Sequence, residues 1–260
     1  MKNILKFIFF VTILTTTSFG SIASEQSQKL LNPGWSFKGF FGKFDRSSLQ
    51  RGYQVYTEVC AACHSMKYLS YRNLAQQGGP EFSEDQAKII ASQFEVIDGP
   101  NSEGDMFTRP AKLSDNFVGP YANEKAAKAA NGGAYPPDMS VLAKARKGGA
   151  SYIYSILLGY DDPPPDVSLE DGVYYNTYMS GNKIKMSKPL SENLVQYSDG
   201  TQATEEQMAK DVSTFLAWAA EPNLEQRHKM GFRAVLYLII ITILVYFSMK
   251  KIWSRIETDV

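Results

Sequence analysis

The two cysteines of this 260-residue chain are separated by two residues, and a histidine follows the second. A disulfide framework across the fold is therefore excluded, so stability must come from the core, a cofactor or a partner. The segment Cys60-Ala61-Ala62-Cys63-His64 has the C-x-x-C-H pattern of covalent haem attachment. Two thiols on one turn reach the vinyl groups on one porphyrin edge, and the next imidazole becomes the proximal iron ligand. The sequence therefore predicts one haem c, held by Cys60 and Cys63, with His64 as a metal ligand.

Two other readings of the cysteine pair are weaker. A structural zinc site needs four ligands, and the only other histidine is His228, near an apolar C-terminal segment. A thioredoxin-like redox pair is expected near a βαβ pattern, and the sequence shows none.

The second axial ligand is expected to be a methionine, because His228 is close to the predicted membrane segment. Four of the nine methionines remain after those in the termini, in an apolar helical face or too near His64 are set aside: Met106, Met139, Met179 and Met186. Met186 lies in a polar loop that offers no packing reason for a thioether. The residues alone favour Met186 and leave Met179 open.

The propionates of a buried haem need hydrogen-bond donors. Arg146 and Tyr152, on either side of Gly148-Gly149, are the candidates. An ordinary surface cation and a core aromatic are equally good readings of these two residues.

The first 23 residues have the pattern of a secretory signal peptide. Lys2 and Lys6 precede an apolar run at residues 7–14, and small residues lead to Ala23, where cleavage is expected. The exported haem domain is then residues 24–227. The simple export signal indicates a bacterial inner membrane with the domain in the periplasm.

A second apolar run, residues 234–249, contains no charged residue. Its sixteen residues would rise about 24 Å as a helix, and flanking residues can make up the rest of the ~30 Å hydrocarbon core. We predict a transmembrane anchor over residues 228–250 and a cytoplasmic tail over residues 251–260. Basic residues flank both ends, so the orientation rests on the signal peptide.

The exported part is expected to be mostly α, with helices separated by long Gly- and Pro-rich loops. Helices are predicted after the capping residues Asp45, Ser83 and Thr204, the last two with glutamine capping-box partners. Further helices are predicted at residues 124–130, 139–147 and 152–158. Strand signals are poor, apart from a short extended piece at Tyr174-Tyr175. The long stretch 161–193 is expected to be organised by a cofactor packed beneath it.

The chain has 27 Lys and Arg residues and 27 Asp and Glu residues, so its net charge does not indicate what kind of partner it binds. Seven acids and one base lie in residues 81–105, and five acids and no base in residues 161–171. These clusters are either a solvated face or a docking field for a basic redox partner.

Together these residues resemble the cytochrome c1 family. Beyond the haem motif, the resemblance rests on these further segments: Ala130-Asn131-Gly132-Gly133-Ala134-Tyr135-Pro136-Pro137-Asp138, Arg146 with Gly148-Gly149, Gly159-Tyr160, the Pro-rich turn, Gly172-Val173-Tyr174-Tyr175-Asn176, and Asp211 to Pro222 leading to the C-terminal anchor. It implies a class I cytochrome c-like haem domain with long loop insertions plus one C-terminal transmembrane helix. It also implies Met186 as the axial ligand, Arg146 and Tyr152 as propionate partners, and Tyr135 and Pro136 as pocket wall. Ser180-Gly181 departs from the Pro-Gly usual in the family, which keeps Met179 as a rival, and Lys185 replaces a small residue.

The resemblance further implies electron transfer from a Rieske iron–sulfur protein to cytochrome c within the ubiquinol–cytochrome c oxidoreductase. Cytochrome b and membrane lipid would be its membrane partners, in a dimeric complex, and no nucleic acid is expected. The chain would be a redox subunit, with no catalytic residue of its own. Three alternatives remain: an anchored cytochrome donating to a terminal oxidase or reductase, a haem enzyme with an open iron position, and a haem-based sensor.

Overall fold

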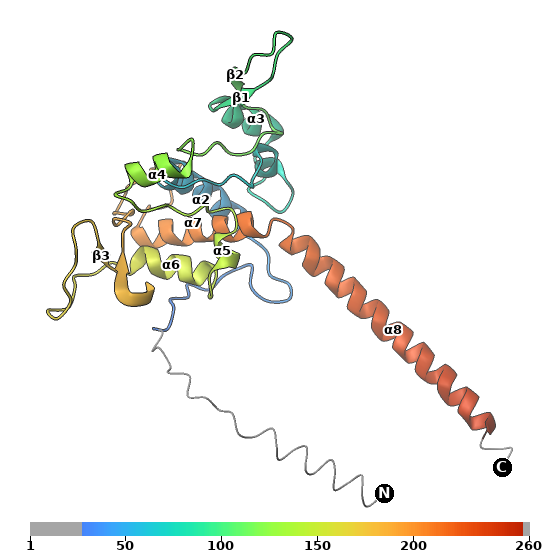
Figure 1. Cartoon of the computed structure of the whole chain (residues 1–260). Coiled ribbons are helices and arrows are strands. Elements are labelled where there is room, and N and C mark those ends of the chain that lie inside the picture. Colours follow the sequence, from blue (N-terminus) through green and yellow to red (C-terminus); the bar gives the residue numbers. More distant parts are fainter. Residues whose placement is uncertain (1–27, 257–260) are drawn as a thin grey trace, which may run out of the picture.

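The computed structural model describes residues 28–256. The predicted signal peptide and the last four residues of the predicted tail lie outside the described residues. The described part is a mostly helical domain, from which one long helix extends alone (Figure 1). The elements in chain order are α2 (Arg46–Glu58), η1 (Cys60–Ala62), η2 (Tyr71–Ala75), α3 (Glu84–Ser92), β1 (Glu95–Asp98), β2 (Phe107–Pro110), α4 (Glu124–Ala130), α5 (Leu142–Ala145), α6 (Ala150–Leu158), β3 (Tyr174–Tyr175), η3 (Ser180–Asn182), β4 (Lys183–Ile184), α7 (Glu205–Ala220) and α8 (Leu224–Ile256).

Helices α2 and α7 form the centre of the domain. They approach closely at Gly52, where an added Cβ would lie 2.2 Å from the Asp211 carbonyl oxygen. Around this crossing, Leu49, Val55 and Phe215 are completely buried. Such a close approach leaves no room for a side chain at position 52, so the glycine is required by the packing.

The predicted helix starts are confirmed. The Asp45 side chain accepts from the Ser48 N–H, and the Ser83 capping box with Gln86 is complete. Thr204 also caps α7 by accepting from the Gln207 N–H. The Gln207 side chain does not complete that box, because its amide donates to Asp211 Oδ2 at 2.9 Å.

The predicted helix at residues 139–147 is wrong in extent, since α5 covers only Leu142–Ala145. Met139 and Ser140 instead bind the segment that follows the haem motif. The Met139 N–H donates to the Ser65 carbonyl at 2.8 Å, and the Ser140 hydroxyl accepts from the Tyr68 N–H at 3.1 Å.

An antiparallel hairpin, β1 with β2, was not predicted from the sequence. It extends beyond α3 at the edge of the domain (Figure 1). A second short pairing, Tyr174 with Ile184 and Tyr175 with Lys183, confirms the extended piece at Tyr174-Tyr175 and closes part of the 161–193 stretch.

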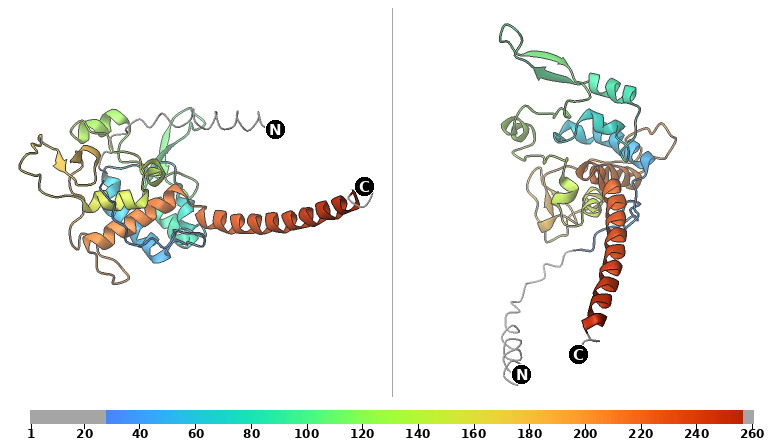
Figure 2. Two further views of the ribbon diagram at one scale, coloured as in Figure 1. Left: turned by 90° about the horizontal axis from the view of Figure 1, so that it is seen from below. Right: turned by 90° about the vertical axis from the view of Figure 1, so that its right-hand side faces the viewer.

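Helix α8 projects from the domain in every view of Figures 1 and 2. Its segment Leu224–Arg255 contains an 18-residue window with a mean hydropathy of 2.2, so α8 is long and apolar enough to cross a membrane. Glu225, in the first turn, is 8% exposed and accepts from both Arg46 Nη1 at 2.8 Å and Nη2 at 2.9 Å. It also accepts from the Phe44 N–H at 3.0 Å, so the base of α8 is fixed to the start of α2.

Candidate functional site

The C-x-x-C-H segment follows directly from α2. Its first residues form the single turn η1, closed by bonds to the Cys60 carbonyl from the Cys63 N–H at 3.1 Å and the His64 N–H at 2.9 Å. This turn brings both thiols and the imidazole onto a short, fixed piece of backbone. Both cysteines are free thiols, Cys60 buried and Cys63 half-buried. Burial, with a smaller effect of Cys63, raises the pKa of Cys60 to about 12, so its thiol is protonated at neutral pH.

The His64 ring is held by one hydrogen bond to the backbone. Its Nδ1 lies 2.8 Å from the Pro137 carbonyl oxygen. Because a carbonyl can only accept, Nδ1 carries the proton and Nε2 keeps its lone pair for a metal. Burial lowers the pKa of His64, which favours this neutral form.

Asp138 fixes the position of the Pro137 carbonyl. Its Oδ2 accepts from the Ser65 hydroxyl at 2.7 Å and from the Lys67 N–H at 3.0 Å. Its Oδ1 accepts from the Ser140 N–H at 2.9 Å. The segment after the haem motif is thereby attached to residues 137–140, more than seventy positions along the chain. Asp138 was not predicted as a site residue.

Two predicted pocket residues, Tyr135 and Pro136, come just before this attachment. Tyr135 is 45% exposed and Pro136 is half-buried. Their neighbour Pro137 supplies the carbonyl that orients His64, so they lie in the same segment as the histidine's partner.

The Met186 segment is attached to the end of α6. The Tyr160 hydroxyl donates to the Met186 carbonyl at 3.0 Å. Asn176, completely buried, donates to the Ile156 carbonyl and accepts from the Tyr178 and Met179 N–H groups. Met186 itself is half-buried. Neither Asn176 nor Tyr160 was predicted as a site residue, although both lie in segments that carried the family resemblance.

Met179, the rival ligand, lies beside a predicted propionate partner. The Tyr152 hydroxyl donates to Met179 Sδ at 3.5 Å. The structure therefore gives the Met179 sulfur a hydrogen-bond partner within the protein.

Arg146 is exposed, and its guanidinium donates to the Ala145 carbonyl at 3.2 Å. Within residues 28–256 it forms no ion pair with an acid. Two glycines with positive φ, Gly148 at 96° and Gly149 at 58°, turn the chain from Arg146 into α6 and Tyr152. The Arg146 guanidinium, which has no acidic partner among the described residues, and the Tyr152 hydroxyl are therefore donors suited to a carboxylate such as a haem propionate.

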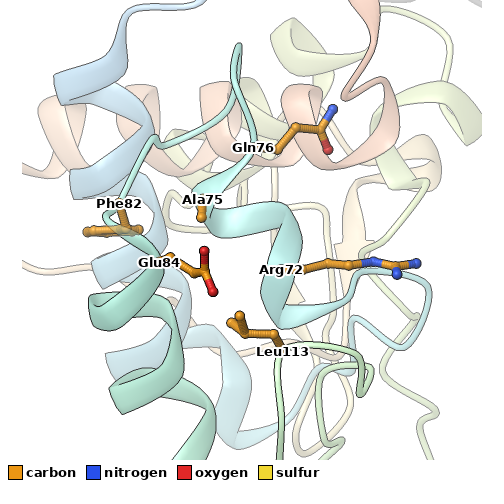
Figure 3. A pocket seen from close by; sticks show the side chains of 6 residues that line it. All are labelled: Arg72, Ala75, Gln76, Phe82, Glu84 and Leu113. Atoms are coloured by element: carbon orange, nitrogen blue, oxygen red, sulfur yellow. The ribbon is translucent and has the colours of Figure 1, made fainter.

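Residues 28–256 offer little evidence of any other kind of site. They contain no group of three or more His, Cys, Asp and Glu side chains placed to hold a metal ion. A shallow pocket between η2 and α3 is lined by Arg72, Ala75, Gln76, Phe82, Glu84 and Leu113 (Figure 3). None of the predicted site residues lines that pocket.

The donor set agrees with the chemistry of a haem. Two thiols on one turn, a neutral imidazole with an unprotonated Nε2 and a methionine on a separately anchored loop match what a c-type haem requires. The fold and the site therefore define a class: mostly helical haem proteins that carry a C-terminal helix able to span a membrane. Within that class, residues 35–256 match the Cytochrome C1 family, and the chain belongs to this family. The resemblance drawn from the motifs is thereby confirmed.

Individual relatives come from both eukaryotes and bacteria. The chain is 47% identical over 245 residues to cytochrome c1 1, heme protein, mitochondrial, of Arabidopsis thaliana, covering 93% of this chain and 79% of that protein. It is 44% identical over 251 residues to cytochrome c1 of Rhodospirillum rubrum, covering 90% and 91%. It is also 47% identical over 251 residues to cytochrome b/c1 of Bradyrhizobium diazoefficiens, covering 89% of this chain and 36% of that longer protein.

Proposed function

We propose that this chain is the haem-bearing electron-transfer subunit of a cytochrome bc1 complex, accepting electrons from a Rieske iron–sulfur protein and passing them to cytochrome c. The observation that carries the proposal is the His64–Pro137 hydrogen bond within a C-x-x-C-H motif of a cytochrome c1 family member. That bond leaves an imidazole ready to ligate iron beside two thiols. The quinol-oxidising activity belongs to the whole complex, and this chain is its redox subunit.

Cys60 and Cys63 would hold one covalently attached haem c, and His64 and Met186 would ligate its iron. When bound, the haem supplies a one-electron iron couple. The protein's residues hold and tune it: Pro137 orients His64, and Tyr160 anchors the Met186 backbone. Arg146 and Tyr152 bind the propionates, while Tyr135 and Pro136 form pocket wall. A thioether ligand would raise the reduction potential of the haem, and with His64 and Met186 both bound the iron would not be open to substrates.

Met186 is preferred to Met179 because the resemblance to the cytochrome c1 family implies an axial methionine in the loop after Tyr174-Tyr175-Asn176 and just before a Lys- and Pro-containing segment. The Tyr160 hydroxyl donates to the Met186 carbonyl and so anchors that loop.

The membrane partner is cytochrome b. The name of the Bradyrhizobium relative, cytochrome b/c1, supports this assignment. Residues 228–250 form the membrane anchor, and residues 24–227 form the haem domain in the periplasm of a bacterial cell, after removal of residues 1–23. Residues 251–260 form the cytoplasmic tail. The complex is a dimer.

The test is purification of the native protein in mild detergent, with identification of the chains that co-purify. We expect cytochrome b and a Rieske protein to be present and quinol to drive reduction of added cytochrome c. We also expect haem to remain on this chain after denaturation, which reports the covalent bonds separately. A haem protein that purifies without those partners and is inactive with quinol would contradict the subunit assignment. It would favour a cytochrome that donates to a terminal oxidase or reductase.

A further inference from the structure

Three phenylalanines cluster outside the core, where the domain meets α8. Phe40 and Phe41 are 54% and 75% exposed, and Phe232 on α8 is 46% exposed. The ring centroids lie 4.9 Å apart for Phe40 and Phe41, and 6.1 and 6.0 Å from each of these to Phe232. Exposing such a cluster to water is unfavourable, so another surface is expected to cover it.

The conformation of the loop that carries Phe40 and Phe41, residues 36–43, is fixed by aromatic packing and backbone hydrogen bonds. We call it the Phe40 loop. Phe37 and Phe44, near its two ends, are buried and their ring centroids lie 4.8 Å apart. Backbone hydrogen bonds close its turns: Lys38 N to Trp35 O, Gly42 N to Gly39 O and Lys43 N to Ser36 O.

A glycine is needed at two places in this loop. Gly39 has a φ of +90°, which only glycine adopts readily. An added Cβ on Gly42 would lie 2.3 Å from the Phe37 carbonyl oxygen. The exposure of Phe40 and Phe41 is thus fixed by the loop itself.

The Phe40 loop lies level with the beginning of the apolar part of α8. His228 Nδ1 donates to the Gly42 carbonyl at 3.3 Å, and Phe232 contacts the rings about 6 Å further along the helix. The uncharged run 234–249 begins two residues after Phe232. In Figure 1 the chain before α2 loops past the start of α8, in agreement with these contacts.

We propose that the Phe40 loop is a second membrane contact, with Phe40 and Phe41 inserted into the boundary between lipid headgroups and acyl chains. The proposal rests on α8 being the membrane anchor. Apolar rings are favoured at this depth, with cationic side chains on the polar side among the headgroups. Lys38 and Lys43, on either side of the two rings, are exposed. Continuity with the lipid-facing surface of α8 is the reason for choosing lipid as the occupant.

The contact also has a mechanical consequence. A single helix crossing a membrane leaves the attached domain free to tilt about its base. A second contact, formed by a loop bonded to that helix, restricts the tilt and so the height of the haem domain above the membrane.

The test uses the full chain purified with its native membrane partners and reconstituted in phosphatidylcholine–phosphatidylglycerol vesicles. Phe41→Cys is labelled with a nitroxide, and the label's collisions with oxygen and with a water-soluble nickel chelate are compared. Val245→Cys, in the apolar run of α8, and Ile97→Cys, 75% exposed on β1, are the matched controls for lipid and water. Unlabelled wild-type protein gives the background.

We expect the ratio of oxygen to nickel collisions at position 41 to exceed that at position 97 several-fold and to approach that at position 245. A label as open to nickel as at position 97 would overturn the proposal. Low collision rates with both reagents would overturn it too, because they indicate burial against a protein partner such as cytochrome b. If position 245 is itself open to nickel, the anchor assignment fails, and that failure is distinct from a failure at position 41 alone.

Discussion

Single residues determine the tautomer and the orientation of the His64 ring. The hydrogen bond from His64 Nδ1 to the Pro137 carbonyl selects the tautomer that can ligate iron, and Asp138 holds that carbonyl by accepting from three groups. The cysteines and the histidine could be predicted from spacing alone. Asp138 could not, because its partners Ser65 and Lys67 are distant in sequence and nothing local marks the pairing.

Asp138→Ala is expected to lower the free energy of unfolding by about 2 kcal/mol, since hydrogen bonds to a charged group are lost and their donors are left behind. Thermal unfolding of the full haem-loaded chain measures this. Asp138→Asn keeps an acceptor oxygen and should recover part of the loss. If His64 loses its orientation as well, the haem absorption spectrum of the alanine variant will change at temperatures where the protein is still folded. An unfolding temperature equal to that of the wild type would contradict the role given to Asp138.

The choice between the two methionines is also made by single residues. Met186→Leu should remove the sulfur ligand, change the visible spectrum and lower the reduction potential by on the order of 0.1 V or more, because the axial ligand strongly sets the potential. Met179→Leu is the matched control and should leave both nearly unchanged. Redox titration with optical detection measures the two variants together. The reverse pattern would assign the iron to Met179.

At the scale of elements, the contact between α2 and α7 contains a buried carboxylate. Asp211, completely buried, accepts from Arg51 Nε at 2.8 Å and Nη2 at 3.1 Å, and from the Ser48 hydroxyl at 2.6 Å. Arg51 also donates to Asp199 at 2.7 Å and lies over the Tyr197 ring. The helix that leads into the haem motif is therefore attached to α7 by polar contacts as well as by packing.

Asp211→Ala should lower the free energy of unfolding by about 3 kcal/mol, because it leaves the largely buried Arg51 without its main partner. The double variant Asp211→Ala with Arg51→Met should be less destabilised than the sum of the single variants, since the unpaired charge is gone. Denaturant unfolding of the full chain in detergent measures all three. Exposed Asp162→Ala is the control, with a change within about 0.5 kcal/mol. Simple additivity would show that Arg51 and Asp211 are not coupled.

Helix starts with polar caps were predictable because the signal is local: Asp45, Ser83 and Thr204 each cap the helix that follows. The β1–β2 hairpin was missed because its residues show no clear alternation. Exposed Ile97 lies next to half-buried Asp98, against the usual pattern of a half-buried strand. The 139–147 helix was overestimated because Met139 and Ser140 bind residues 65–68 instead, a tertiary contact that periodicity cannot reveal.

At the scale of the whole molecule, residues 28–256 form a compact domain and a projecting helix, and the Glu225 carboxylate is one of the groups that join them. The apolar part of α8 was predictable from composition. Its start at Leu224 was not, because the first turn is polar and is stabilised by the domain through Glu225. Arg46, which binds Glu225, also donates to Glu81 at 2.9 Å and so links α8 to the turn before α3.

Glu225→Gln is expected to weaken this connection and let the haem domain move relative to α8. The glutamine amide would keep an acceptor for Arg46 but lose the charge. Arg46→Ala would remove the ion pair entirely and leave Glu225 only its bond from the Phe44 N–H. Both variants should remain in the membrane and keep the wild-type haem spectrum, because neither residue contacts the haem motif. Quinol-driven reduction of the haem should slow several-fold, and more in Arg46→Ala, because electron transfer requires the domain to meet its donor at a fixed height.

Stopped-flow spectroscopy of the purified complex measures the rate. Lys88→Ala, which removes an exposed ion pair with Glu84 on α3, is the control and should leave the rate unchanged. Wild-type rates in both variants would show that α8 and the domain are held together without this ion pair.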